Sequence, residues 1–306
     1  MRRKYCMNNG LHFISGLPRS GSTLLAAILR QNPRIHAGMS SPVGPLFQGL
    51  LGAMGPRNEF SVFMTPDQRE NVLRGLFDSY YKDIHPTKIV FDTGRLWCAK
   101  MAAVSRLFPE ARMIVCVREL AWIMDSFERI LHRSPLVTSR MFHPRDAATI
   151  YTRVNALAAP RGTVGFPWNA VQEAFYGEYA DRLVIIDYEA LTRDPKRAVD
   201  FIYEKLELEP FAHDFDNVTY EDGSEVDAQL GVPGLHAVGR KVGFVERPTI
   251  LPPDLFERFS GRNFWRRPGA NPRNVAVLLP EGDRRRRPPY PGMQAPIGRR
   301  MPFAGA

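Results

Sequence analysis

The segment from residue 11 to residue 30 combines a short apolar run, a loop framed by two glycines and an amphipathic stretch. It reads LHFISGLPRSGSTLLAAILR, with Gly16 and Gly21 at the two ends of the loop. Glycines let the backbone turn sharply, so that several N–H groups and the positive end of the following helix converge on one anion. The pattern therefore predicts a strand, a phosphate-binding loop and a helix, in that order.

The loop differs from the lysine-containing loops of kinases and nucleotidases. Those loops carry lysine at the position of Ser22, followed by a hydroxyl residue that holds magnesium. Here the cation lies inside the loop as Arg19, and no strand end shows a clear pattern of four apolar residues and an aspartate, although Asp92 and Asp187 come nearest. We therefore expect an anion site that differs from the usual magnesium-nucleotide site. A kinase or nucleotidase with this fold stays as an alternative.

Apolar runs of strand length recur along the chain. After the first run, they stand at residues 34–38, 88–92, 112–117 and 182–187, with polar turns and amphipathic stretches between them. Such alternation is typical of buried parallel strands joined by crossover helices. The sequence therefore predicts a three-layer α/β fold of the phosphate-loop type, with a mainly parallel five-stranded sheet between helices. Residues 42–86 are predicted to be a helical insertion between the second and third strands.

The composition changes near residue 268. Of the 39 residues from 268 to 306, 20 are Pro, Gly or Arg, and they include the run Arg284 to Arg287. We expect residues 1–267 to form one domain and residues 268–306 to be a mostly disordered tail. Much of the basic excess behind the net charge of +9 lies in this tail, so we expect no nucleic-acid ligand. A nucleic-acid binder that uses the tail stays as a second alternative.

No apolar run is long enough for a signal peptide or a membrane helix. The run after the basic N-terminus extends only from Leu11 to Ile14. The three cysteines, Cys6, Cys98 and Cys116, are too widely spaced for a disulfide framework or a zinc site. We expect a cytoplasmic protein with no membrane span and no metal site.

A second candidate anion site follows the apolar run at 112–117. Arg118 comes directly after this run, and Ser126 lies eight residues later, in a helix that begins near Ala121. At the carboxyl edge of a parallel sheet, an arginine fork and a helix hydroxyl can clamp a phosphate monoester. Each residue is common in such a position, so the prediction depends on their combination with the loop.

The loop PRSGST and the pair Arg118 and Ser126 together resemble the sulfotransferases that use 3′-phosphoadenosine 5′-phosphosulfate (PAPS), over roughly residues 11 to 267. The resemblance implies one set of residues for the 5′-phosphosulfate, namely Arg19, Ser20, Gly21, Ser22 and Thr23. It implies that Arg118 and Ser126 bind the 3′-phosphate.

Two later segments extend the resemblance. IIDYEALTRDP at 185–195 is similar to a family segment whose tyrosine lies near the adenine, which implies this role for Tyr188. HAVGRKVGF at 236–244 resembles the segment that closes over the 3′-phosphate, with Arg240 and Lys241 as its cations.

The activity implied is transfer of a sulfuryl group from PAPS to a hydroxyl or amine acceptor, with no metal required. Sulfuryl transfer requires less charge neutralisation than γ-phosphoryl transfer, which accounts for the missing lysine. Loop amides with the hydroxyls of Ser22 and Thr23 would hold the sulfonate and 5′-phosphate oxygens. Arg19 would stabilise charge on the bridging oxygen as it leaves.

The sequence leaves the general base and the acceptor open. Relatives use His or Glu as the base; here Asp92 is the first candidate, because a carboxylate at that strand end would face the acceptor, and His36 is the second. The acceptor could be a small hydroxylated molecule, a lipid, a sugar or a peptide tyrosine. Aromatic residues such as Phe60 and Tyr81 could line an apolar pocket for it, or pack in the core. A homodimer is also left open.

Overall fold

The described strands form one parallel sheet. The computed structural model describes residues 10–84, 87–220 and 223–282. Its strands are β1 (Leu11–Gly16), β2 (Ile35–Ala37), β3 (Ile89–Thr93), β4 (Met113–Val117), β5 (Leu183–Asp187) and β6 (Ala276–Leu278). They lie in the order β2-β3-β1-β4-β5-β6, and every pairing is parallel. The predicted α/β class is confirmed.

The strands alternate their side chains between two helical layers. In β4, Val115 packs in one core and Cys116 in the other, and both are fully buried. The first layer contains α4 (Met101–Leu107), α5 (Leu120–Arg133) and α7 (Gly165–Tyr176), and the second contains α1 (Ser22–Leu29), α8 (Tyr188–Arg193) and α9 (Pro195–Lys205). Because both faces of the sheet are covered, its central strands are largely apolar, although β1 also carries the buried Ser15 and β3 the buried Asp92. The predicted three layers are confirmed.

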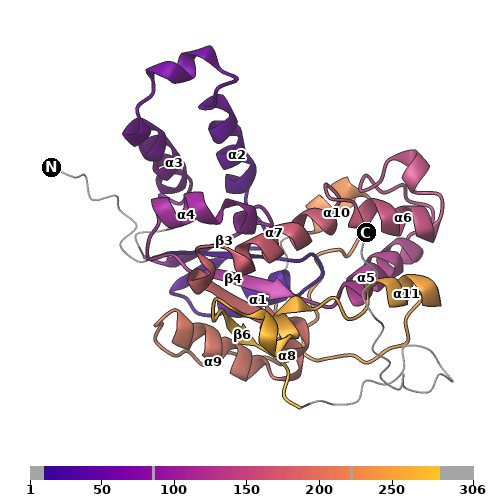
Figure 1. Ribbon diagram of the computed structural model, residues 1–306. Coiled ribbons are helices and arrows are strands. Elements are labelled where there is room, and N and C mark those ends of the chain that lie inside the picture. Colours follow the sequence, from indigo (N-terminus) through magenta and orange to yellow (C-terminus); the bar gives the residue numbers. More distant parts are fainter. Residues whose placement is uncertain (1–9, 85–86, 221–222, 283–306) are drawn as a thin grey trace.

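A helical hairpin separates β2 from β3. It consists of α2 (Val43–Ala53), a 3₁₀ helix (Glu59–Phe63) and α3 (Pro66–Tyr80), and it extends away from the sheet (Figure 1). Its base packs on the body of the protein, because Phe47 and Phe77 both make ring contacts with Trp97. This hairpin occupies most of the segment that the sequence predicts as an insertion.

The described part of the chain contains three further α-helices. They are α6 (Ile150–Ala158), α10 (Ser224–Leu230) and α11 (Pro253–Phe259). Helices α6 and α11 contact α5 and lie beside it in Figure 1. Within the described ranges, none of the helices combines the length and the apolarity that crossing a lipid bilayer requires.

The sheet has one strand more than the five predicted. The sixth, β6, lies inside the segment 268–306 and pairs with β5 in the register Ile185 to Val277. Val275 and Leu278 are buried, so residues 271–278 belong to the folded domain. The predicted boundary at residue 267 is therefore wrong: a three-residue strand was hidden in a stretch rich in Pro, Gly and Arg. The rest of the predicted tail, residues 283–306, lies outside the described residues.

The close approach of β1 to β4 gives a first prediction. Gly16 has a φ of 119°, and a Cβ there would overlap the backbone carbonyl of Cys116. We expect Gly16→Ala to lower the free energy of unfolding by about 3 kcal/mol or more, since both the backbone and the contact are strained. In α2, a Cβ at Gly49 would meet nothing within 4 Å. Gly49→Ala should therefore raise the free energy of unfolding by about 0.5–1 kcal/mol, as measured by urea denaturation. Equal stabilities of the two variants would contradict this account.

Candidate functional site

A cavity of about 630 Å³ lies at the carboxyl edge of the sheet. Ligands of open parallel sheets bind at this edge. The lining comes from the segments that follow β1, β2, β3, β4 and β5, together with residues 235–243. The cavity therefore joins the predicted loop and Arg118 with a third segment late in the chain, whereas the buried Ser126 is not part of its lining.

The loop after β1 forms the floor of this cavity. Gly21 has a φ of 93° and precedes the first residues of α1, Ser22 and Thr23, so the N-terminal amides of the helix face this edge. All three residues line the cavity. Ser20 does not, because it is buried and its hydroxyl lies against the carbonyls of Leu17 and Cys116, 2.9 Å from the latter. The side chain of Ser20 thus holds the loop against β4, and it does not contribute to the lining of the cavity.

Arg19 links the loop to α5. Its Nε donates to Ser126 Oγ at 3.1 Å, and its Nη1 donates to the carbonyl oxygen of Leu235. The backbone of Arg19 is left-handed, with a φ of 57°, a conformation that side-chain-bearing residues rarely adopt. The sequence assigns Arg19 and Ser126 to opposite ends of the nucleotide, whereas the structure bonds them to each other. The two predicted sites are therefore one continuous site.

Arg118 stands beside Arg19 on the next strand of the sheet. Its Nη1 donates to the carbonyl oxygen of Arg19 at 3.1 Å, and its guanidinium lies 4.1 Å from the ring centre of Tyr188. Tyr188 is fixed in turn because Asp187, the residue before it, accepts hydrogen bonds from Arg266 at 2.7 and 2.8 Å. The structure thus brings the predicted residues Arg118 and Tyr188 together, and both line the cavity.

The charges of Arg19 and Arg118 favour an anionic ligand at this part of the cavity. Burial, with the nearby charge of Arg118, lowers the pKa of Arg19 to about 10. Burial also lowers the pKa of Arg118. None of the described residues that line the cavity is an aspartate or a glutamate. Two neighbouring, partly buried guanidinium groups without a lining carboxylate gain most from an anionic ligand, because it offsets both desolvation and repulsion.

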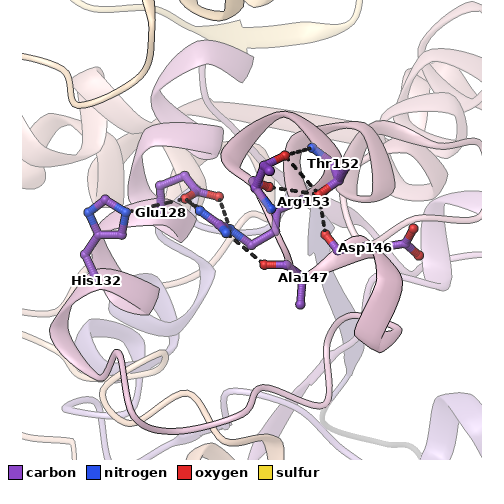
Figure 2. A network of polar contacts seen from close by, with 7 residues as sticks. Glu128, His132, Asp146, Ala147, Thr152 and Arg153 are labelled. Atoms are coloured by element: carbon purple, nitrogen blue, oxygen red, sulfur yellow. Dashed lines mark hydrogen bonds and ion pairs between the residues drawn. The ribbon is translucent and has the colours of Figure 1, made fainter.

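Buried acids hold α5, and with it Ser126, in place. Glu128 is fully buried and accepts from Nη2 of Arg153 at 2.5 Å and from its Nε at 3.0 Å. Figure 2 shows Arg153 reaching across to Glu128 from α6. Asp125 accepts from Arg247 at 3.0 Å, which ties a late segment of the chain to the same helix. Removing one partner of such a buried pair leaves an uncompensated charge, so α5 has little freedom to move.

Asp92 does not face the cavity, so the prediction that its carboxylate meets the acceptor is wrong. The residue is fully buried, and its two oxygens accept from Ser41 Oγ at 2.7 Å, the Tyr81 hydroxyl at 2.5 Å and Trp97 Nε1 at 2.7 Å. Burial raises the pKa of Asp92, and these three hydrogen bonds act in the opposite direction. Among its partners, Ser41 lines the cavity. Asp92 therefore supports the wall of the site from behind.

The other predicted side chains divide between the cavity and its surroundings. His36 is half-buried, its ring lies 5.8 Å from that of Tyr81, and it is not part of the lining. Arg240 is exposed outside the lining and donates to Asn217 at 2.7 Å. Lys241 lines the cavity and pairs with Asp216 at 2.8 Å. Of the two cations in the late segment, the structure therefore brings only Lys241 to the site.

A histidine and aspartate pair at the cavity was not predicted from the sequence. His236 lines the cavity, and its Nδ1 lies 2.5 Å from Oδ1 of the buried Asp227. The backbone N–H of His236 donates to the other oxygen of Asp227 at 2.9 Å. The nine-residue spacing did not reveal the pair, because the chain reverses after α10 at Gly231, whose φ is 66°. A second missed residue, Arg95, lines the cavity two residues after β3.

The fold and the site define an α/β protein with a cavity at the carboxyl edge of its sheet whose described lining contains arginine and lysine but no aspartate or glutamate. A family model described as the sulfotransferase family matches residues 12–213. Because this match spans more than half of the 306 residues, the chain belongs to the sulfotransferase family. The family predicted from the sequence is therefore confirmed. A search of curated proteins gave no significant match.

Two solved sulfotransferase domains are similar to this chain. The domain from the curacin biosynthetic pathway is 16% identical, with 82% of this chain and 96% of that chain covered and a TM-score of 0.50. The domain from the Synechococcus PCC 7002 olefin synthase is 20% identical, with coverages of 82% and 95% and a TM-score of 0.46. At these identities, the first likeness shows a shared fold.

The network around Asp92 gives a second prediction. Asp92→Ala leaves three buried donors without their acceptor, so we expect the free energy of unfolding to fall by about 2–5 kcal/mol. The control is Asp83→Ala at an exposed position, which should change stability by no more than about 0.5 kcal/mol. Urea unfolding of both variants measures the difference. If Asp92→Ala were as stable as its control, the supporting role assigned to Asp92 would be wrong.

Proposed function

We propose that this sulfotransferase takes its sulfuryl group from PAPS and transfers it to a hydroxyl acceptor, with no metal required. The lining of the cavity is the observation that supports this proposal most. It includes the N-terminal end of α1, Arg19, Arg118 and Lys241, and among the described lining residues there is no carboxylate. PAPS carries anionic groups at two ends of one nucleoside. A lining of cations and amide donors that extends from the loop to Arg118 fits such a ligand.

The donor fits the residues at the β4 and β5 side of the cavity. Backbone amides at the start of α1 and the hydroxyls of Ser22 and Thr23 would hold the 5′-phosphosulfate. Arg118 would bind the 3′-phosphate beside the Tyr188 ring. A Cβ at Gly21 would lie 3.2 Å from that ring, so glycine at this position lets Tyr188 approach the loop closely. These contacts support the donor assignment made from the resemblance.

The same lining favours PAPS over a nucleotide bound with magnesium. Magnesium takes oxygen ligands, commonly one or two carboxylates together with the substrate phosphates. Among the described residues, no group of three or more His, Cys, Asp and Glu side chains is placed to hold a metal ion. The lysine that contacts the outer phosphates in kinases is replaced by Ser22. These features favour sulfuryl transfer over the kinase alternative.

His236 is the general base that the geometry supports. Asp227 accepts at Nδ1 of the ring, which orients the imidazole and leaves Nε2 to take a proton. No described residue bonds to Nε2. Since the ring lines the cavity close to Arg19, whose guanidinium binds the carbonyl of the preceding residue, an acceptor hydroxyl can reach both groups.

PAPS supplies the sulfuryl group that is transferred. Nε2 of His236 would take the proton of the acceptor hydroxyl as its oxygen forms a bond to sulfur and the bond from sulfur to the 5′-phosphate oxygen breaks. Arg19 and the loop amides would stabilise the negative charge that remains on the 5′-phosphate. Each group is held by the protein before the reaction, which limits reorganisation during the step.

A third prediction tests the donor. PAPS, or its product 3′-phosphoadenosine 5′-phosphate (PAP), should stabilise the protein without added metal, by about 2.7 kcal/mol at a hundredfold excess over Kd. Thermal unfolding with PAP, with ATP and with ATP plus magnesium measures the effect. Equal stabilisation by magnesium-ATP, with none by PAP, would overturn the donor assignment.

Arg118→Ala sharpens the test of the donor. It should weaken PAP binding about tenfold or more, the scale of a lost charge-assisted hydrogen bond. A nucleotide that lacks the 3′-phosphate should bind wild type and Arg118→Ala with nearly equal affinity. A similar loss of affinity for both nucleotides would mean that Arg118 does not contact the 3′-phosphate.

A fourth prediction tests the base. His236→Gln should lower kcat by about 100-fold or more, because it removes the group that takes the proton. PAP affinity and the melting temperature should change little. The control is the same substitution at an exposed histidine, His143→Gln, which should leave kcat unchanged. A kcat of His236→Gln within about threefold of wild type would exclude His236 as the base.

A further inference from the structure

Arg95 is a cation of the cavity that the donor assignment does not use. It lies in the turn between β3 and the 3₁₀ helix Trp97–Lys100, and it lines the cavity together with Thr93 and Leu96. Each of the other lining cations has a protein partner: Ser126 for Arg19, the ring of Tyr188 for Arg118 and Asp216 for Lys241. Within the described residues, no hydrogen bond or ion pair involves Arg95.

The surroundings of Arg95 suit a ligand anion. Its side chain is exposed, yet burial in the protein around it lowers its pKa. A side chain inside a cavity explains both observations, because solvent can reach it there although protein atoms surround it. A desolvated guanidinium gains most from a charge-assisted pair with an anion, and its planar fork matches carboxylate and phosphate oxygens. The environment of the Arg95 guanidinium therefore favours binding of a negatively charged group.

The order of the strands places Arg95 away from the proposed donor. Strand β1 and its loop lie between β3, which precedes Arg95, and β4, which precedes Arg118. The proposed donor contacts, from the loop to Arg118 and Tyr188, lie on the β4 and β5 side of the loop. Arg95 lies on the opposite side, with Ser40 and Ser41 after β2. An acceptor attacking the sulfuryl group must enter from that opposite side.

The candidate base lies at the same end as Arg95. Gly223 contacts both His236 and Met39, since a Cβ built on it would lie 3.1 Å from each side chain. Met39 precedes the serines after β2 and lines the cavity next to them. His236 and Met39 are thus brought together through Gly223, and Met39 and Arg95 follow the neighbouring strands β2 and β3. The candidate base and Arg95 are therefore both associated with the β2 and β3 side of the loop.

We propose that the acceptor carries an anionic group, a carboxylate or a phosphate, in addition to its hydroxyl, and that Arg95 binds this group. The inference rests on the proposed function and narrows its acceptor to one chemical class. With its anion on Arg95 and its hydroxyl at His236, the acceptor is held at two points, which fixes the direction of attack. Neutral alcohols and phenols lack the first of these contacts and are poor substrates.

The test uses matched acceptors that differ in charge. The pairs are 4-hydroxyphenylacetate and its methyl ester, 3-hydroxydecanoate and its methyl ester, and glycerol 3-phosphate and glycerol. Turnover with PAPS gives kcat/KM for each compound, and calorimetry gives its affinity for the PAP-saturated protein. We expect the anionic member of at least one pair to exceed its neutral partner tenfold or more. The first two pairs test a carboxylate and the third tests a phosphate.

Variants at Arg95 assign the preference to one residue. In Arg95→Met, kcat/KM for the anionic acceptor should be within about threefold of kcat/KM for its neutral partner, and PAP affinity should not change. Arg95→Lys should retain part of the preference for the anionic acceptor, since lysine keeps the charge but lacks the planar guanidinium. The control is Arg57→Met at an exposed position of the hairpin, which should keep the full preference. Equal melting temperatures of the variants exclude a folding defect.

Three results would overturn the inference. The first is that wild type shows no preference for the anionic acceptor, either in turnover or in binding. The second is that Arg95→Met keeps the preference of wild type. The third is that Arg95→Met loses as much PAP affinity as Arg118→Ala does, which would assign Arg95 to the donor. If PAP itself fails to bind wild type, the proposed function is wrong and this inference falls with it. If PAP binds normally, only the acceptor class is in question.

Discussion

The guanidinium of Arg19 joins the parts of the chain on which this site depends. It starts from the loop after β1, bonds to Ser126 on α5 and to the carbonyl of Leu235, and its own carbonyl accepts from Arg118. Three segments that are distant in sequence, around Arg19, Arg118 to Ser126 and Leu235, therefore meet at one partly buried cation. Because Leu235 precedes His236, the same contact fixes the distance between the anion site and the candidate base. The remaining elements serve to hold these segments still, as Glu128 and Asp125 do for α5.

Much of the fold could be predicted because the signals were local. Each central strand is a short apolar run bounded by polar turns, so its position follows from burial on both faces of a parallel sheet. The sixth strand could not be found in this way. Three residues of β6 carry little periodicity, and their pairing with β5 is a tertiary contact that the composition of residues 268–306 conceals.

The sequence also predicted the part of the candidate site that depends on local pattern. The loop residues and Arg118 stand at strand ends, and the end of a parallel strand has a known place in the sheet. Asp92 also ends a strand, but its environment is set by Tyr81, Trp97 and Ser41, and no spacing rule brings these donors together. The pairing of His236 with Asp227 likewise depends on a chain reversal. Local pattern thus located the anion site, whereas burial and pairing decided which acids and bases face it.

The distribution of charge in the cavity separates two tasks. Around the loop, burial and the nearby charge of Arg118 lower the pKa of Arg19, an effect that an anion bound between the two arginines relieves. Arg95 follows β3, on the other side of the loop, and His236, which Asp227 orients, is linked through Gly223 to Met39 after the neighbouring strand β2. A single anion could satisfy the first cluster without reaching the second. The two cationic positions therefore suit a reaction in which a charged donor and a charged acceptor enter from opposite sides, with the cations offsetting the repulsion between them.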